Sequence, residues 1–212
     1  MTRSSRTAEK STGIVRAIRA VFLAVILLLV ALYGFERSHR PLPFGLSCKL
    51  PAPRACLADL ALRADSADAR NLIPESEALA RANPALDLAQ SFNGVLLAKD
   101  GQVEKSGKFL LNSARLGWRD LAGQTFSYLL AVQDEDPVRA ALHLDSIYKL
   151  DEGNVANAQL MEPLLADPRL REEFAKHLAV STHYRSQFIA SYVGVPEEAW
   201  EARLDLLDKA VQ

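Results

Sequence analysis

The sequence lacks the short motifs that accompany most enzyme chemistry. It has no G-x-x-x-x-G-K-[ST] or G-x-G-x-x-G loop for phosphate, no G-x-S-x-G turn to present a serine, and no H-E-x-x-H pair for zinc. We therefore expect no catalytic residue, no cofactor and no small-molecule substrate. An enzyme of a class without recognisable motifs is the least favoured alternative.

Residues that bind metals or exchange protons are few and poorly spaced. The closest two of the four histidines are six residues apart, which does not place them on one helical face; the four are His39, His143, His177 and His183. Acidic residues adjoin at Glu172–Glu173 and Asp134–Asp136. Adjacent side chains on a helix point in different directions, so these acids are interpreted as solvated surface. No metal site is expected.

Aromatic residues make up only 7% of the 212 residues, and runs of β-branched residues are few, which argues against β-sheet. Hydrophobic residues still reach 49%, carried largely by leucine and alanine. Both residues favour helices. The sequence therefore predicts an all-α protein with one folded domain and an appendage.

A strong overall charge is also absent, because the net charge is −1. This balance hides a basic N-terminus: residues 1–19 hold five basic residues and one acidic residue, which leaves 20 basic and 25 acidic residues elsewhere. A mildly acidic body lacks the basic face that phosphate backbones require. Nucleic acid is therefore not expected as a partner.

One long hydrophobic run accounts for the basic N-terminus. Residues 14–35 form a stretch of 22 residues interrupted only by Arg16 and Arg19, whose side chains can reach lipid headgroups. As a helix this stretch spans roughly 33 Å, about one hydrocarbon core. We predict an uncleaved transmembrane helix over 14–35, after a basic cytoplasmic tail over 1–13. A cleaved signal peptide, for which Leu32 and Gly34 make a poor site, and a buried helix of a soluble protein are the alternatives.

A proline-rich stalk is predicted over 36–55, with prolines at Pro41, Pro43, Pro51 and Pro53. The two cysteines of the chain, Cys48 and Cys56, are predicted to form a disulfide; unpaired thiols and a metal or redox role are the alternatives. A disulfide favours an oxidising compartment. With the basic tail, it predicts a single-pass protein of a bacterial inner membrane, N-terminus in the cytoplasm and C-terminal domain in the periplasm.

The remaining residues, 56–212, are predicted to form a helical domain with an internal repeat. Two helical hairpins, Ala85–Trp118 and Arg119–Asp151, follow each other at a spacing of 34 residues, so that Val103 aligns with Pro137. This helix–turn–helix period is the length of the tetratricopeptide repeat. The pattern predicts a degenerate, tetratricopeptide-like stack of antiparallel helix pairs.

The first helices of the two hairpins are predicted at Leu86–Lys99 and Asp120–Asp134. Each carries a mainly apolar stripe on one face: Leu88, Phe92, Val95 and Leu96 on the first, and Leu121, Thr125, Tyr128, Leu129 and Val132 on the second. Between the helices of the first hairpin, Gly101 is predicted to take a positive φ.

Further helices are predicted on both sides of the repeat. They cover Cys56–Ala64, Ala69–Ala82 with Pro74 near a helix start, Asn154–Ala166, Pro168–Ser181, Arg185–Tyr192 and Pro196–Val211. The last helix is expected to close the stack with its charged residues outside, namely Glu201, Arg203, Asp205, Asp208 and Lys209.

Particular residues of this region resemble a known group of proteins. They are Asn93-Gly94, Asp100-Gly101, Gly117-Trp118-Arg119-Asp120, Gln124 and Ala140 to Asp145, together with the later stretches PLLADPRLREEFAKHL and RSQFIASYVG. On these residues the chain resembles, from about Asn83 to Tyr192, the tetratricopeptide-like membrane proteins of alphaproteobacteria. Ser106 stands where the repeat has alanine and Tyr128 where the first unit has Gly94, so the family's peptide-binding residues are not carried over. The resemblance implies a role in cell-envelope or exopolysaccharide assembly.

Binding is predicted on the concave side of the stack, which the first helices of the hairpins line. The candidate side chains lie outside the apolar stripes and are Gln90, Asn93, Gln124 and Ser127. Amide groups can both donate and accept, which suits a peptide backbone, although these residues could also merely face water. The next candidate is the junction Trp118, Arg119 and Asp120, for which packing and a helix N-cap at Asp120 are the other interpretation.

These observations favour a non-catalytic, membrane-anchored scaffold that binds a protein partner in the cell envelope. The alternative is an accessory structural subunit of an inner-membrane complex, held mainly through residues 14–35.

Overall fold

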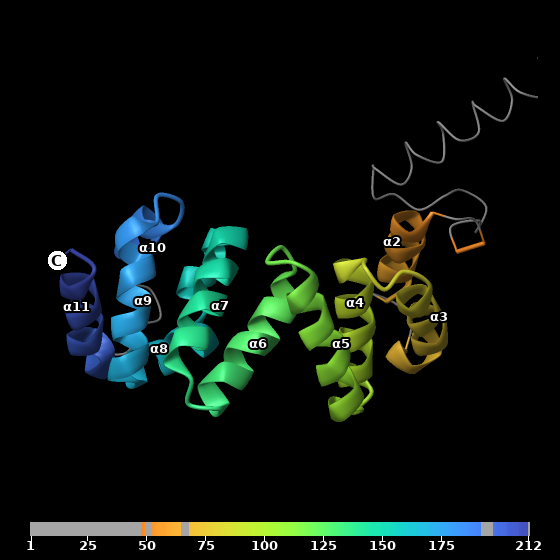
Figure 1. The fold of residues 1–212 in the computed structure, drawn as a ribbon, viewed down its shortest axis with the longest axis horizontal. Helices are drawn as coiled ribbons and strands as arrows, with labels where there is room; N and C mark the ends of the chain where they lie inside the picture. The colour runs from red at the N-terminus through yellow and green to blue at the C-terminus, as the bar shows by residue number, and fades with distance from the viewer. Residues whose placement is uncertain (1–47, 50–51, 65–67, 192–196, 212) are drawn as a thin grey trace, which may run out of the picture. The chain divides into compact units, whose positions relative to one another are not determined.

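The structure is a computed structural model that describes residues 48–49, 52–64, 68–191 and 197–211. These residues form helices α2 to α11 and two short 3-10 helices, and no β-strand occurs among them (Figure 1). The all-α prediction is confirmed. The chain divides into two compact units, residues 1–68 and residues 69–212.

The described part of the first unit is a disulfide loop leading into a helix. Cys48 and Cys56 are joined, with their sulfur atoms 1.94 Å and their Cα atoms 4.5 Å apart. Helix α2 (Pro53–Ala64) begins before the predicted start at Cys56, so the last residues assigned to the stalk are helical. Proline can open a helix because the first amides of a helix have no intrahelical partner.

No helix in the described ranges is both long and apolar enough to cross a membrane. The transmembrane helix predicted over 14–35 and most of the predicted stalk lie outside those ranges.

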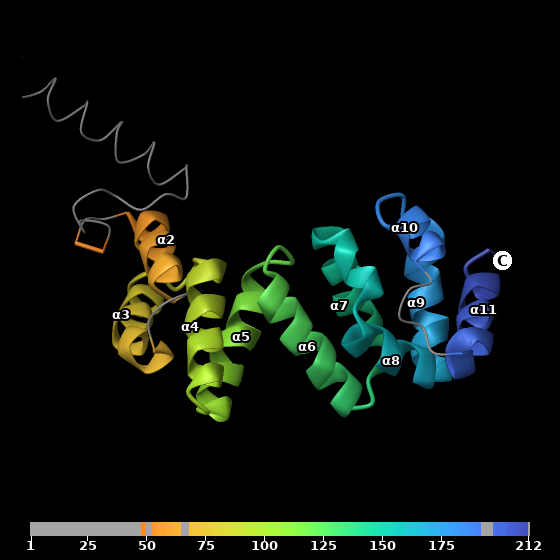
Figure 2. The same cartoon turned by 180° about the vertical axis from the view of Figure 1, so that it is seen from behind.

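The second unit begins with helix pairs that follow one another in chain order (Figures 1 and 2). Successive members of the first five helices pack on one another: α3 (Ala69–Ala82), α4 (Asp87–Lys99), α5 (Val103–Leu116), α6 (Leu121–Gln133) and α7 (Pro137–Leu150). The starts of α4 and α6, Asp87 and Leu121, are 34 residues apart, as are those of α5 and α7, Val103 and Pro137. The predicted register of stacked helix pairs is confirmed.

The unit ends with shorter helices. They are a 3-10 helix (Glu152–Ala156), α8 (Ala158–Ala166), α9 (Pro168–Val180), α10 (Arg185–Ala190), a second 3-10 helix (Glu197–Ala199) and α11 (Trp200–Lys209). Helix α9 packs on α7, α8 and α11. Two predictions need correction here: the helix expected from Asn154 is divided at Asn157, and Pro74 lies inside α3 rather than near its start.

Aspartates define several helix starts. Asp120, Asp136 and Asp167 precede α6, α7 and α9, and each accepts a hydrogen bond from a backbone amide of the first turn, at 2.7, 3.0 and 2.9 Å. Such N-caps satisfy amides that have no partner inside the helix. Pro137 and Pro168 then occupy the first helical position, which suits their fixed φ.

The two hairpin turns share one backbone conformation. Gly101 has φ 80°, which confirms the predicted positive φ, and the equivalent residue of the second hairpin, Glu135, has φ 54°. In each turn the next amide returns to a carbonyl in the last turn of the preceding helix: Gln102 N donates to Leu97 O and Asp136 N to Ala131 O, both at 2.9 Å. The second hairpin therefore closes with a side chain in a conformation that favours glycine.

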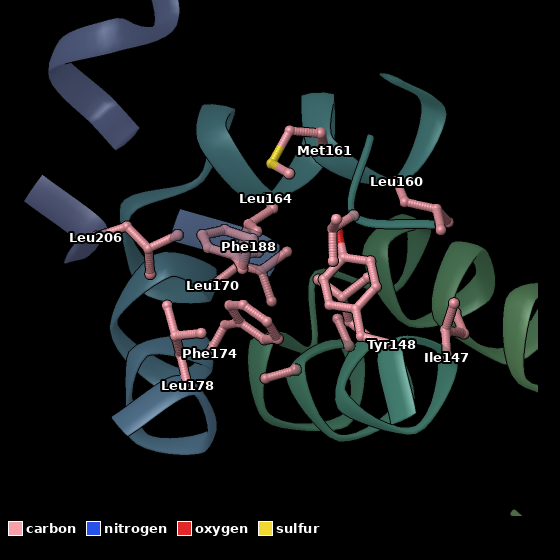
Figure 3. Close-up of a cluster of buried hydrophobic side chains, with 14 of the residues drawn as sticks. Ile147, Tyr148, Leu160, Met161, Leu164, Leu170, Phe174, Leu178, Phe188 and Leu206 are labelled. Carbon is pink, nitrogen blue, oxygen red and sulfur yellow. The ribbon is translucent and has the colours of Figure 1, made fainter. Parts of the chain in front are cut away.

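The largest core of the described residues lies between α6 and α11 (Figure 3). Tyr148, Phe174, Tyr184 and Phe188 meet there, with ring centroids 5.4 to 6.3 Å apart, and all four are fully buried. The Tyr184 hydroxyl donates to Asp145 Oδ1 at 2.8 Å. Burial, followed by this contact with a carboxylate, raises the pKa of Tyr184, so the hydroxyl stays protonated and remains a donor.

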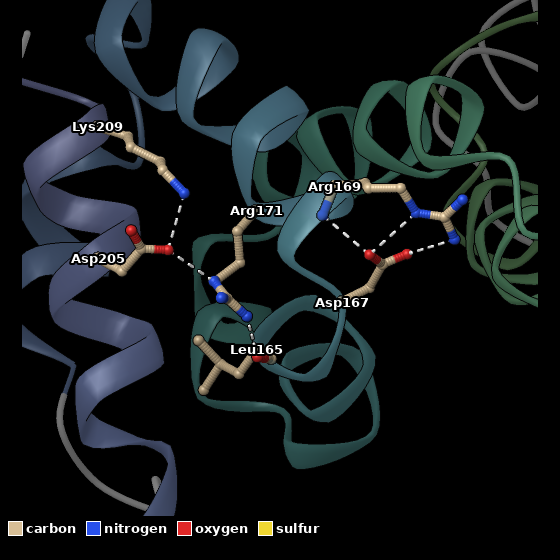
Figure 4. A network of polar contacts seen from close by, with 6 residues as sticks. All are labelled: Leu165, Asp167, Arg169, Arg171, Asp205 and Lys209. Carbon is tan, nitrogen blue, oxygen red and sulfur yellow. Dashed lines mark hydrogen bonds and ion pairs between the residues drawn. The ribbon is translucent and has the colours of Figure 1, made fainter.

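Polar contacts tie α11 to α8 and α9 (Figure 4). Arg171 of α9 donates to Asp205 of α11 at 3.0 Å and also to the backbone oxygen of Leu165 at the end of α8. Lys209 reaches the same Asp205 oxygen at 2.9 Å. These hydrogen bonds hold the pKa of Asp205 below its ordinary value, the one from Lys209 first and the one from Arg171 next.

The expectation that α11 turns all its charged residues outward is wrong for Arg203. Its side chain is buried, and its guanidinium donates to the backbone oxygens of Phe188 and Ser191 at the end of α10. The last carbonyls of a helix lack intrahelical partners, so this arginine satisfies them. In its place, apolar side chains lie outside: Leu204 is 61% and Val211 is 76% exposed.

Candidate functional site

The four polar residues predicted to line a binding groove are instead buried. Gln90, Asn93, Gln124 and Ser127 are each less than 5% exposed. In α4, Gln90 Nε2 donates to the Ala80 backbone oxygen at 2.9 Å, and Asn93 Oδ1 accepts from Ser76 Oγ at 2.7 Å. Both contacts join α4 to α3, so these amides hold helices together and cannot meet a partner.

Gln124 plays the same part in α6. Its Nε2 donates to the Gly117 backbone oxygen at 3.3 Å, and its Oε1 lies 2.8 Å from Nδ1 of His143 on α7. Burial lowers the pKa of His143, and the positive charge of Arg139 acts in the same direction. A neutral imidazole donating to Gln124 is the form that fits this contact.

Small residues explain why the polar face turns inward. A Cβ added at Gly94 would lie 2.8 Å from Leu110 Cγ, and one added at Gly123 would lie 2.9 Å from the backbone nitrogen of Ala114. The glycine at position 94 makes room for the side chain of Leu110, and the one at position 123 makes room for the backbone of α5. Hydrogen-bonded polar residues share the buried faces with Leu96, Leu97 and Leu110, while Leu88, Leu121 and Leu129 remain partly exposed.

The predicted apolar stripes are therefore only partly buried: of their nine residues three are exposed and four are half-buried. Of their members only Leu96 and Tyr128 are fully buried, whereas Leu88 is 37%, Leu121 38% and Leu129 45% exposed. Each of these leucines therefore leaves more than a third of its surface outside the packing of the stack. A cluster of exposed apolar side chains commonly marks an interaction site.

These side chains line a hollow of about 700 Å³, here called the apolar groove. Its walls are α4 and α6 and its floor includes α5; the principal lining residues are Leu88, Val95, Leu110, Leu121, Phe126 and Leu129. Leu110 is almost fully buried beneath the groove. The helices that form the walls are those predicted to bind a partner, but the side chains are apolar rather than amide-bearing.

The junction Trp118, Arg119 and Asp120 borders the apolar groove. Asp120 Oδ2 accepts hydrogen bonds from Gly123 N at 2.7 Å and Ser113 Oγ at 2.6 Å, which gives it the helix-capping role considered from the sequence. The Arg119 guanidinium lies 5.4 Å from the Trp118 ring centroid, in cation–π range. Arg119 is exposed and also lines the groove, so a positive charge stands at its edge.

The other candidates for chemistry are engaged elsewhere. Asp134 and Asp136 both pair with Arg139, and Glu173 pairs with Lys176. His177 and His183 lie 3.7 Å and 3.4 Å from the carboxylates of Asp145 and Glu152. Within the part of the chain that the structure describes, no group of three or more histidine, cysteine or acidic residues could hold a metal ion.

Sequence reasoning placed its candidate residues on α4 and α6, which do line a hollow, but on faces of these helices that are buried. The signal that could have found the groove is the placement of small residues: Gly94 on α4 and Gly123 on α6 mark the sides where backbones approach closely. Val95 and Leu129 lie about 100° and about 120° around their helices from those glycines, and they are half-buried and exposed, respectively. Comparisons with models of known protein families, with curated protein sequences and with solved structures found no match.

Proposed function

We propose that this chain is a non-catalytic interaction scaffold that holds an amphipathic helix in the apolar groove between α4 and α6. The observation that carries the proposal is the inversion of the two groove helices: their amides are buried, while Leu88, Leu121 and Leu129 are left exposed. Leaving several leucines in water is unfavourable by about 25 cal/mol for each Å² of apolar surface, which an occupant would recover.

The chemistry of the lining favours a helical occupant over an extended peptide. An extended peptide has free backbone amides and carbonyls, which need hydrogen-bond partners when they are buried. Asn93 and Gln124, which could have supplied such partners, point into the stack. A helix satisfies its own backbone groups and offers apolar residues at i, i+3 or i+4, and i+7, the mode by which helices bind hydrophobic grooves.

The edge of the groove adds a charge preference. Arg119 is exposed beside Leu121, so an occupant with an acidic residue next to its apolar stripe would gain an ion pair there. Exposed pairs contribute only about 0.2–1 kcal/mol, and salt weakens them. Apolar contact should therefore dominate the affinity, which should depend only weakly on salt.

The proposal also includes the location of the protein in the cell. The uncharged run Ala20–Phe35 after a basic N-terminus supports an inner-membrane anchor, and a Cys48–Cys56 disulfide suits a periplasmic domain. Such a protein would hold its partner close to the membrane, in keeping with assembly of the cell envelope or of exopolysaccharide. A C-terminal alkaline phosphatase fusion should be active and a C-terminal green fluorescent fusion dark; the reverse pair of results would contradict this topology.

Binding can be tested with the full chain in detergent and two synthetic peptides. One peptide is an amphipathic helix with leucines at i, i+4 and i+7 and a terminal glutamate; the other has the same composition in scrambled order. Fluorescence anisotropy should show binding of the first peptide only. Leu129→Asp should weaken that binding by about tenfold or more, because it places a charge in the apolar lining.

Leu142→Asp is the matched control. Leu142 lies on α7, is 51% exposed and is not part of the groove lining, so the same chemical change there should leave binding intact. Equal affinity of Leu129→Asp and Leu142→Asp for the amphipathic peptide would rule out the groove as the binding surface, provided that both variants retain the melting temperature of the wild type.

A further inference from the structure

Helix α11 carries the kind of stripe that the apolar groove would accept. Trp200 and Leu204, one turn apart, are 36% and 61% exposed, and Val211 just beyond the helix end is 76% exposed. The face that a helix turns to water is normally polar. The exposed face of α11 departs from that pattern, because Trp200, Leu204 and Val211 are apolar.

The stripe is available while α11 stays in its place. Leu206 and Arg203 hold the helix to the core and are fully buried. Residues 204 and 206 point in directions about 200° apart on a helix, so the core contact and the stripe use different faces. Docking through Leu204 would therefore require no unfolding.

The charged residues beside the stripe of α11 and the length of this stripe also match the apolar groove. Glu201 and Asp208 are exposed and follow Trp200 and Leu207 directly, so they flank the stripe, while Arg119 stands at the edge of the groove. Trp200 to Leu207 spans seven residues, or about 10 Å of helix, which is close to the rise between Leu88 and Val95 in the groove wall. Two helical turns of apolar residues on α11 would thus meet two helical turns of apolar residues in the wall of the groove.

We propose that α11 of a second copy of this chain occupies the apolar groove. The inference rests on the proposed function, because it gives the same groove a specific occupant. Within one copy, α11 packs on α8 and α9 whereas α4 packs on α3 and α5, so the contact joins two molecules. The two surfaces are different patches, which makes the contact head-to-tail: each copy that fills a neighbour's groove still has its own groove open.

The association should be weak in solution and stronger at a membrane. One helical stripe in a groove buries less than the roughly 1,200 Å² typical of stable complexes. A reversible contact of this kind becomes significant when the copies share a surface and their effective concentration rises.

Cross-linking between two differently tagged full-length copies tests the geometry. One copy carries Leu129→Cys and the other Leu204→Cys, with Cys48 and Cys56 left in their disulfide. A short bismaleimide should give a product that contains both tags. A product that joins two Leu129→Cys copies, or two Leu204→Cys copies, without the two-tag product would show a symmetric contact and overturn the proposal. The absence of any cross-linked product would also overturn it.

A second variant separates this inference from the proposed function. Leu204→Asp should abolish the concentration-dependent rise in sedimentation coefficient and still bind the synthetic amphipathic peptide, because its groove is intact. Leu129→Asp should lose both the self-association and the binding of the peptide. If Leu204→Asp self-associates like the wild type, α11 is not the occupant, even when peptide binding establishes the groove. If the peptide fails to bind while the two-tag product forms, the groove is specific to this chain's own helix.

Discussion

Helices α3 to α6 meet through leucines interspersed with small and polar residues, whereas helices α7 to α11 meet mainly through aromatic rings and leucines. In the first group the contacts include Ser76 with Asn93, Gln90 with the Ala80 carbonyl, and close approaches at Gly94 and Gly123. In the second group Tyr148 and Phe174 centre a fully buried cluster. Both groups are rich in leucine, yet only the second buries most of its large apolar side chains.

The difference separates helices that bury most of their large apolar side chains from helices that leave many of theirs partly exposed. A buried amide that is hydrogen-bonded contributes about 1 kcal/mol net, less than a fully buried leucine or phenylalanine side chain. The first group thus holds its helices partly with contacts that are individually weaker and directional, and it leaves Leu88, Leu121 and Leu129 partly exposed along the apolar groove. The second group supplies the apolar burial that the unit needs in order to stay folded.

Removing the central ring of the second group should have the largest effect. Phe174→Ala leaves a cavity between Tyr148, Tyr184 and Phe188, and the expected loss in the free energy of unfolding is about 3–5 kcal/mol. Urea unfolding followed by circular dichroism measures it. Val180→Ala in the same helix is the control: Val180 is 79% exposed, so its change should stay within about 0.5 kcal/mol. Comparable losses in the two variants would mean that the aromatic cluster does not dominate stability.

A methyl group at the close approach of α5 and α6 should have the next largest effect. The Cβ of Gly123→Ala would meet the Leu110 backbone oxygen at 3.0 Å and the Ala114 nitrogen at 2.9 Å, and neither can move aside without its helix. We expect a loss of about 1–3 kcal/mol and weaker peptide binding, because α6 is a wall of the groove.

Gly107→Ala is the matched control for that change. Its Cβ would meet only the tip of the Phe126 ring, at 3.1 Å, and a side chain can shift. The better helix propensity of alanine, about 1 kcal/mol, should offset the remaining strain. If Gly107→Ala costs as much as Gly123→Ala in thermal unfolding, the tight seam does not lie where the structure places it.

The sequence predicted the helices well because their signals are local. Asp136-Pro137 and Asp167-Pro168 are start signals, and Gly101 marks a turn, each readable without knowledge of the neighbours. The 34-residue register then fixed which helices pair. The face that each helix turns inward is a property of the pair rather than of the helix, and it depends on how closely two backbones approach.

This dependence on the partner helix explains why some residues that were predicted to be exposed are buried. Gln90 and Asn93 look like surface residues until their hydrogen bonds to α3 are known. Arg203 looks like an outer charge until the free carbonyls at the end of α10 are seen to need it. In each case a partner distant in sequence decides burial, and periodicity along one helix carries no information about that partner.

Substitutions in the two hairpin turns should change the free energy of unfolding in opposite directions. At Glu135, with φ 54°, glycine would relieve backbone strain, so Glu135→Gly should raise the free energy of unfolding by about 0.5–1 kcal/mol. At Gly101, with φ 80° and no neighbouring atom within 4 Å of an added Cβ, Gly101→Ala should lower it by about 1 kcal/mol through backbone strain alone. Chemical denaturation of both variants measures the pair, and shifts of the same sign would show that the turns are not equivalent.

The smallest effect concerns pH at the seam of α6 and α7. The pKa of His143 in the folded chain lies below its ordinary value of 6.5, chiefly because of burial, so the unfolded chain takes up the proton first as pH falls. His143 thus contributes stability that is fully present above about pH 6.5 and declines below it, until pH reaches the lowered folded pKa.

His143→Gln keeps a donor for Gln124 Oε1 and has no proton to gain. Urea unfolding between about pH 8 and about pH 5 should show the wild type losing stability relative to this variant. A difference that stays constant across this range would mean that His143 titrates alike in the folded and unfolded chains, and that its contact with Gln124 does not depend on the neutral ring.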